Sequence, residues 1–233
     1  MPRRLRTLFA GVPTHVVQRG NDRRDCFFSE HDRHFYLLQL EELASLFGCA
    51  VHAYVLMDNH VHLLATPSAP NGISLLMKHL GQRFVQHVNR IHKRTGALWE
   101  GRFYSSVVDS GAYLFSCHRY IEMNPVRAKM VAHPRDYQWS SYRANAEGHA
   151  CPFLTPHPDY LALADNELDR RHFYRMMFDL SLDRSAMEEI RAVTRGGFAF
   201  GSEEFKERLG AESGRPMAAQ RRRGLTLKTP VRV

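Results

Sequence analysis

Residues 50–65 read AVHAYVLMDNHVHLLA. Two apolar runs, residues 50–57 and 60–65, flank the polar pair Asp58-Asn59, which is typical of a turn. The pattern predicts two antiparallel strands joined as a hairpin, although a single bulged strand would give the same pattern. In either case His60 and His62 point to the same side, because side chains two positions apart on a strand share a face.

Regular patterns on both sides of this stretch predict alternating strands and helices. Residues 14–18 and 103–108 resemble short strands. Apolar residues at helical spacing predict helices over residues 32–47, 73–94 and 112–123, the first of them facing the core through Phe35, Leu38, Leu43 and Leu46. The order β-α-β-β-α-β-α predicts an α+β fold, in which an antiparallel sheet carries helices on one face.

Charge and sequence pattern divide the 233 residues into three parts. The net charge is +8, and basic residues outnumber acidic ones 18 to 12 in residues 1–150, whereas residues 151–210 hold 8 basic and 11 acidic residues. We expect a main domain over residues 1–150, a helical appendage over 151–210 and a basic, disordered tail over 211–233. The predicted helices of the appendage span residues 157–169, 171–180, 185–193 and 203–209. The basic parts are the candidates for contact with a polyanion such as nucleic acid.

The sequence also argues against several classes of protein. No apolar run reaches the roughly 18 residues of a membrane span, and no apolar stretch of a signal peptide follows the basic start. The cysteines at positions 26, 49, 117 and 151 are scattered and form no CxxC pair, which argues against a zinc ribbon. These features favour a cytoplasmic protein with reduced thiols.

The candidate metal ligands are His60 and His62, whose spacing on one strand suits a shared ion. The alternative is a pair of polar residues on the solvated face of an edge strand. The other histidines at positions 79, 87 and 92 are expected on the surface, and His87 and His92, five apart, should not share a helix face.

The candidate nucleophile is Tyr120, and Asn124 lies four residues after it. If the helix continues, the two side chains share a face, and the amide oxygen could complete a His/His/Asn metal site. The alternative is a tyrosine packed in the core and an asparagine that forms a turn before Pro125.

Candidate DNA contacts are basic side chains, for which simple surface charge is the alternative. They lie in the loop after the first strand, on the long helix and beside the predicted chemistry: Arg19, Arg23, Arg24, Arg83, Arg90, Lys93, Arg94, Arg102, Arg119 and Arg127. Trp99 and Phe103 could stack on unpaired bases, although core packing is the simpler interpretation. In the tail, Arg215 and residues 221–223 could follow phosphates.

Four motifs in a fixed order carry a resemblance to a known family. Residues 53–64 read AYVLMDNHVHLL, residues 98–103 LWEGRF, residues 119–128 RYIEMNPVRA and residues 139–142 WSSY. Together they resemble the REP-associated tyrosine transposases of the single-tyrosine HUH (His, bulky hydrophobic, His) superfamily. The early QRGN at residues 18–21 fits as well, and the resemblance covers about residues 10–145.

The resemblance implies a ferredoxin-like fold, with residues 1–150 as the transposase catalytic domain. It implies that His60 and His62 bind Mg²⁺ or Mn²⁺, that Tyr120 is the nucleophile, and that Asn124 stands where relatives carry the longer glutamine as third ligand. Zinc stays open, because two imidazoles suit it better than magnesium. The implied reaction cuts and rejoins single-stranded, often hairpin-forming DNA through a 5′-phosphotyrosine, in a bacterial cytoplasm and as a monomer or homodimer.

Two other functions remain as alternatives. A protein derived from such a transposase could bind hairpin nucleic acid without cutting it, but binding alone needs neither the histidine pair nor the tyrosine. A zinc hydrolase could use His-x-His, but the sequence offers no HExxH-type helix and no third ligand at fixed spacing.

Overall fold

The computed structural model describes residues 6–179 and 184–218 and is built on a four-stranded antiparallel sheet. The strand order is β2-β3-β1-β4, with bounds β1 (Thr14–Arg19), β2 (Cys49–Met57), β3 (His60–Pro67) and β4 (Tyr104–Val107). Helix α1 (Glu30–Leu46) connects β1 to β2, and α2 (Gly72–Ile91) connects β3 to β4. This βαββαβ arrangement confirms the predicted ferredoxin-like α+β fold.

The stretch at residues 50–65 forms a hairpin. Met57 pairs with His60 across the two-residue connection Asp58-Asn59, so the hairpin rather than a single bulged strand is confirmed. A register shift between Val51 and Ala53 places a bulge at the far end of the same pair. The segment at residues 139–142 then covers the free edge of β2, where Leu56 N–H donates to the carbonyl of Trp139.

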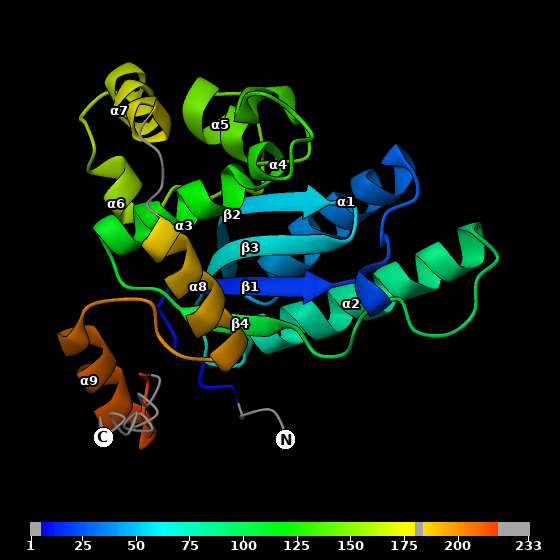
Figure 1. The fold of residues 1–233 in the computed structure, drawn as a ribbon, viewed down its shortest axis with the longest axis horizontal. Helices are drawn as coiled ribbons and strands as arrows, with labels where there is room; N and C mark the ends of the chain where they lie inside the picture. The colour runs from blue at the N-terminus through cyan, green and yellow to red at the C-terminus, as the bar shows by residue number, and fades with distance from the viewer. Residues whose placement is uncertain (1–5, 180–183, 219–233) are drawn as a thin grey trace, which may run out of the picture.

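Helices lie on both faces of the sheet, whereas the element order predicts them on one face (Figure 1). Helices α1 and α2 pack behind it as the view is drawn, and they form the layer that the ferredoxin-like order requires. Helix α3 (Ala112–Glu122) packs on β2 and β3 from the front, and α8 (Arg184–Gly196) packs there on β4 and β1. The front face, which carries His60 and His62, is therefore covered by helices that follow the βαββαβ unit.

Helix α1 begins earlier and faces the core differently than the sequence predicts. Ser29 caps it: the Ser29 hydroxyl accepts from Asp32 N–H, and the Asp32 carboxylate accepts from Ser29 N–H at 3.0 Å. Leu38 and Leu46 are 62% and 65% exposed, so the prediction that they face the core is wrong, whereas Leu43 is buried as expected. The core side also presents Tyr36, Leu40 and Ala44.

Two histidines, one on α2 and one just after its last residue, also differ from the prediction that they lie on the surface. His87 is buried, and its Nε2 lies 3.2 Å from the Asp32 carboxylate. His92 Nε2 lies 2.9 Å from the other oxygen of the same carboxylate. They reach one partner because His92 lies just past the last helical residue, where the chain leaves the helical path.

Helices from beyond residue 150 pack on elements of the first 150 residues. Helices α5 (Tyr142–Glu147), α6 (Pro158–Leu161) and α7 (Glu167–Asp179) pack around Tyr142, Tyr160 and Tyr174. The predicted helix over residues 157–169 is broken, because α6 ends at Leu161 and α7 starts at Glu167.

Helix α9 (Glu203–Ser213) packs against the N-terminal segment through Phe9, Phe205 and Leu209. Met217 is buried in the same cluster, so the chain stays packed past residue 210, where the sequence placed the start of the tail. Residues 219–233, with the arginines at 221–223, lie outside the described residues. No helix within the described ranges has the length and apolar character needed to span a bilayer.

Candidate active site

Strand pairing gathers the candidate metal ligands on the front face of the sheet. His60 of β3 lies opposite Arg19 of β1, and His62 lies opposite Val17. Because side chains alternate, His15 of β1 joins the same face, and its ring stacks on that of His62 with 5.1 Å between centroids. The rings of His60 and His62 are 5.0 Å apart.

Neighbouring groups hold one nitrogen of each candidate ligand. His60 Nδ1 lies 2.6 Å from the side-chain oxygen of Asn59, which can only accept, so Nδ1 carries the hydrogen and Nε2 keeps its lone pair. His62 Nδ1 lies 2.8 Å from His15 Nε2, and His15 Nδ1 lies 3.1 Å from the Thr194 hydroxyl. When each ring donates from Nδ1 along this chain, His62 Nε2 is also free to bind a ligand.

The histidines are suited to metal binding because burial keeps them neutral. Burial lowers the pKa of His60 to about 4, with a further contribution from the positive charges of Arg19 and Arg127. Burial lowers the pKa of His15 to about 3 and holds that of His62 well below its usual value. Neutral imidazoles offer lone pairs at physiological pH, as metal coordination requires.

The candidate nucleophile lies beside these rings. The Tyr120 ring is 5.6 Å from the His62 ring and 5.8 Å from the His15 ring, edge-on to both. The Arg127 guanidinium lies 4.6 Å from the Tyr120 ring centroid, and it also donates to the Tyr120 carbonyl. Burial lowers the pKa of Arg127 to about 10, so the group stays positively charged at neutral pH, next to the phenol.

One cavity of about 480 Å³ joins these groups. Asn124 lines it together with Tyr120, although α3 ends at Glu122 and Asn124 begins the short helix α4 (Asn124–Arg127). The residues that line the cavity are His15, Val17, Arg19, Arg23, His60, His62, Glu100, Tyr104, Tyr120, Asn124, Arg191, Thr194 and Arg195.

The donor set fits a divalent cation that takes few protein ligands. Within the described residues, no group of three or more His, Cys, Asp and Glu side chains could hold a metal ion. The free Nε2 atoms of His60 and His62 therefore need oxygen partners, which the Asn124 amide, water and a DNA phosphate can supply. Mg²⁺ and Mn²⁺ sites on phosphate substrates are commonly completed in this way.

The predicted DNA contacts are scattered, and only some reach this cavity. Arg19 and Arg23 line it and Arg127 packs against Tyr120, whereas Arg24 is exposed in the neighbouring turn. Arg119 is half-buried on α3, where burial lowers its pKa. Arg102 lines a second cavity on the α2 side of the sheet.

The basic residues of α2 lie elsewhere. Arg83 donates to Gln39 at 2.6 Å and to Glu42 at 2.8 Å, and thus links α2 to α1. Arg90, Lys93 and Arg94 lie at the C-terminal end of α2, which extends beyond the sheet (Figure 1). Arg94 lies over the Phe28 ring at 4.9 Å.

The sequence did not single out His15, Glu100, Tyr104, Arg191, Thr194 and Arg195, which also line the cavity. For His15 a signal existed, because it lies within the strand predicted over residues 14–18. Its partner depends on how β1 pairs with β3, which no local pattern encodes. The α8 residues carry no local signal, since they arrive only when α8 packs on the sheet.

Comparisons with known proteins agree with this arrangement. A family model described as "Transposase IS200 like" matches residues 9–124, which span β1 to Asn124. No curated protein matches the chain significantly.

Two solved structures are similar. The first, a REP-associated tyrosine transposase bound to a REP hairpin, is 15% identical with a TM-score of 0.55, and the match covers 68% of this chain and 93% of that one. The second, a putative transposase from Deinococcus radiodurans R1, is 19% identical with a TM-score of 0.36, over 55% of this chain and 92% of that one. The first likeness shows a shared fold, and the second is too distant to support a conclusion. With its ferredoxin-like sheet and the family match over residues 9–124, this chain belongs to the IS200-like transposase family.

Proposed function

We propose that this protein cuts and rejoins single-stranded DNA with Tyr120 as the nucleophile. The observation that carries the proposal is the meeting of Tyr120, His60 and His62 in one cavity, with Arg127 against the phenol. A structural role alone would not require a phenol beside two imidazoles whose Nε2 atoms are free for a ligand.

In the proposed step, the Tyr120 oxygen attacks phosphorus while the bond from phosphorus to the 3′ oxygen breaks. The phenolic proton is lost to solvent, and the departing 3′ oxygen gains one, so the products are a 5′-phosphotyrosine and a free 3′-hydroxyl. A hydroxyl of a second DNA end can reverse the step, because the phosphodiester energy is kept in the covalent link.

The residues have distinct roles in this proposal. Arg127 stabilises negative charge that develops on the Tyr120 phenol during the attack. His60 and His62 would hold Mg²⁺ or Mn²⁺, with Asn124 as a third ligand, and the ion would polarise a non-bridging phosphate oxygen. Arg19, Arg23, Arg191 and Arg195 would orient the DNA backbone.

Hairpin-forming DNA is the proposed substrate class. The similar solved structure is of a transposase bound to a REP hairpin, and this chain shares its fold. A hairpin flanked by single-stranded DNA offers a duplex that the protein can hold and a phosphate of the unpaired segment that can enter the cavity.

The test is covalent adduct formation on a labelled single-stranded hairpin with Mg²⁺ or Mn²⁺, resolved on denaturing gels. We expect wild-type protein to form an adduct, and Tyr120→Phe to bind the hairpin but form none. Tyr104→Phe is the matched control, since Tyr104 lines the same cavity and should retain adduct formation. Adducts from Tyr120→Phe would overturn the assignment, and hairpin binding without any wild-type adduct would favour the non-cleaving alternative.

A further inference from the structure

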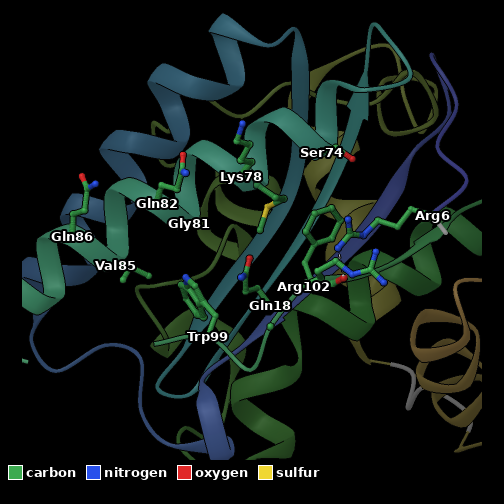
Figure 2. A pocket seen from close by; sticks show the side chains of 13 residues that line it. Arg6, Gln18, Ser74, Lys78, Gly81, Gln82, Val85, Gln86, Trp99 and Arg102 are labelled. Atoms are coloured by element: carbon green, nitrogen blue, oxygen red, sulfur yellow. Dashed lines mark hydrogen bonds between the residues drawn. The ribbon is translucent and has the colours of Figure 1, made fainter. Parts of the chain in front are cut away.

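A second cavity of about 640 Å³ lies between α2 and the segment that leads into β4 (Figure 2). Its volume falls within the range of about 300–1,000 Å³ that is typical of small-molecule sites. Figure 2 shows Trp99 beneath Gly81 and Val85 of α2, while Arg6 and Arg102 lie together at the opposite end. Gln18, which points away from the catalytic face on β1, also lines it.

The cavity offers a surface on which a planar ring can stack. Trp99 is half-buried, and its buried Nε1–H has no hydrogen-bond partner among the residues that the structure describes. Such a group usually finds an acceptor when it is buried, so an acceptor from outside the chain would complete it. Gly81 keeps this side open, because a Cβ there would lie 3.7 Å from Trp99 Nε1 and a longer side chain would fill the space.

The charge of the cavity favours an anionic ligand. Arg6, Lys78 and Arg102 line it, and within residues 6–179 and 184–218 no acidic side chain does. The Arg6 guanidinium lies 3.6 Å from the centroid of the Phe103 ring, which holds that cation at the rim. The amides of Gln18, Gln82 and Gln86 can donate to and accept from the edge of a base.

The second cavity adjoins the candidate active site across one short segment. Trp99, Arg102 and Phe103 line the second cavity, whereas Glu100 and Tyr104 line the catalytic one. On β1, Gln18 lines the second cavity, and its neighbour Arg19 lines the candidate active site. A strand with its phosphate at Tyr120 would therefore need to pass only residues 99–104 to reach Trp99.

We propose that this cavity binds an unstacked nucleotide of the single-stranded DNA, with its base against Trp99 and its phosphate near Arg6, Lys78 and Arg102. The inference rests on the proposed function, because it assumes that the strand in the second cavity is the one cut at Tyr120. Base stacking on an aromatic ring tolerates any base, so this site contributes affinity and positioning rather than a full sequence code.

The test measures binding, so it does not depend on cleavage. Full-length Tyr120→Phe protein is titrated with oligothymidylate and with an abasic oligomer of the same length, with fluorescence anisotropy and tryptophan emission as readouts. The chain has only two tryptophans, and Trp139 is buried in the core, so emission changes can be assigned with Trp139→Phe. We expect oligothymidylate to quench Trp99, and Trp99→Leu to weaken its binding about 5-fold or more. Binding of the abasic oligomer should not change.

A second pair of variants keeps the test valid if Trp99→Leu fails to fold. Gly81→Leu fills the space over Trp99, whereas Gly81→Ala only makes an ordinary contact and serves as the matched control. The proposal predicts weaker oligothymidylate binding for Gly81→Leu alone. Equal affinity for the abasic and thymidylate oligomers, or unchanged affinity in both Trp99→Leu and Gly81→Leu, would overturn it. Neither result bears on adduct formation at Tyr120, which the wild-type assay decides separately.

Discussion

At the scale of single residues, His15 shows how a neighbouring strand orients the candidate metal ligand His62. It is not itself expected to touch the metal, but it fixes His62 through Nδ1 and is fixed in turn by Thr194. Groups that orient a metal-binding histidine in this way raise metal affinity, because they select the tautomer and hold the ring.

Replacing His15 should therefore weaken metal binding without removing a ligand. We expect His15→Ala to lower Mn²⁺ affinity about 10- to 100-fold, as is usual when such a partner is lost. Isothermal titration with Mn²⁺ measures the effect. His52→Gln is a suitable control, since His52 is also buried on the sheet but contacts Thr66 and Thr155 instead. Mn²⁺ affinity equal to that of wild type would contradict the role assigned to His15.

The buried His118 makes the free energy of unfolding depend on pH. Burial lowers its pKa to about 3, and its Nδ1 lies 3.1 Å from the Tyr174 hydroxyl. Between the ordinary value of 6.5 and about 3, the unfolded chain binds a proton that the folded chain does not. Acidification below pH 6.5 should thus lower the free energy of unfolding, by up to about 1.4 kcal/mol per pH unit for this group.

Urea denaturation across this pH window tests the prediction. His118→Gln keeps a polar group near Tyr174 but cannot titrate, so its stability should fall less steeply with acidification. His149→Gln, at an exposed position, should follow the wild-type curve. If His118→Gln and wild type show parallel curves, His118 does not contribute to the slope.

At the scale of elements, α8 has the largest consequence for the site. It packs on β4 and β1, brings Thr194 to His15 and Ser106, and places Arg191 and Arg195 at the cavity. The packing is apolar, since Ile190 and Val193 are buried in the same core cluster as the sheet. The family match ends at residue 124, so α8 is an element of this chain outside the matched range.

Loss of this packing should be costly. Ile190 is 1% exposed, so Ile190→Ala should lower the free energy of unfolding by about 2–5 kcal/mol in urea denaturation. Arg184→Ala, at an 89% exposed side chain on the same helix, should change it by no more than about 0.5 kcal/mol. Similar, small effects of both substitutions would mean that α8 does not pack on the sheet as described.

The elements also show what sequence patterns can and cannot predict. The hairpin at residues 50–65 and the order of helices were predictable, because alternation and helical spacing are local properties. The face of α1 was mispredicted, because its exposed leucines at 38 and 46 look like core residues until the neighbours are known. His60, His62 and Tyr120 stood out through their motifs, whereas His15 and the α8 residues depend on strand register and helix packing.

At the scale of the whole molecule, distant parts of the chain bring positive charge around the candidate active site. Arg19 and Arg23 come from β1 and the turn after it, Arg127 from α4, and Arg191 and Arg195 from α8. The overall charge of +8 adds a general attraction to DNA. Affinity for single strands should therefore fall with salt.

The salt dependence can be assigned to particular residues. If Arg191 and Arg195 each contact one phosphate, the double substitution Arg191→Ala/Arg195→Ala should reduce the slope of log affinity against log salt by about 1.4. The pair Arg184→Ala/Arg208→Ala removes the same charge outside the cavity and should leave the slope nearly unchanged. Equal slopes in the two double variants would show that the α8 cations at the cavity make no phosphate contact.

The chemical identity of the DNA–protein link tests directly whether Tyr120 is the nucleophile. Wild-type protein is incubated with single-stranded hairpin DNA and Mn²⁺, the adduct is digested with protease, and the DNA-bearing peptide is sequenced by mass spectrometry. The proposed mechanism predicts a single peptide in which Tyr120 carries a 5′-phosphate, formed with Mn²⁺ and absent with a chelator. A link at any other residue, or one through a 3′-phosphate, would contradict it.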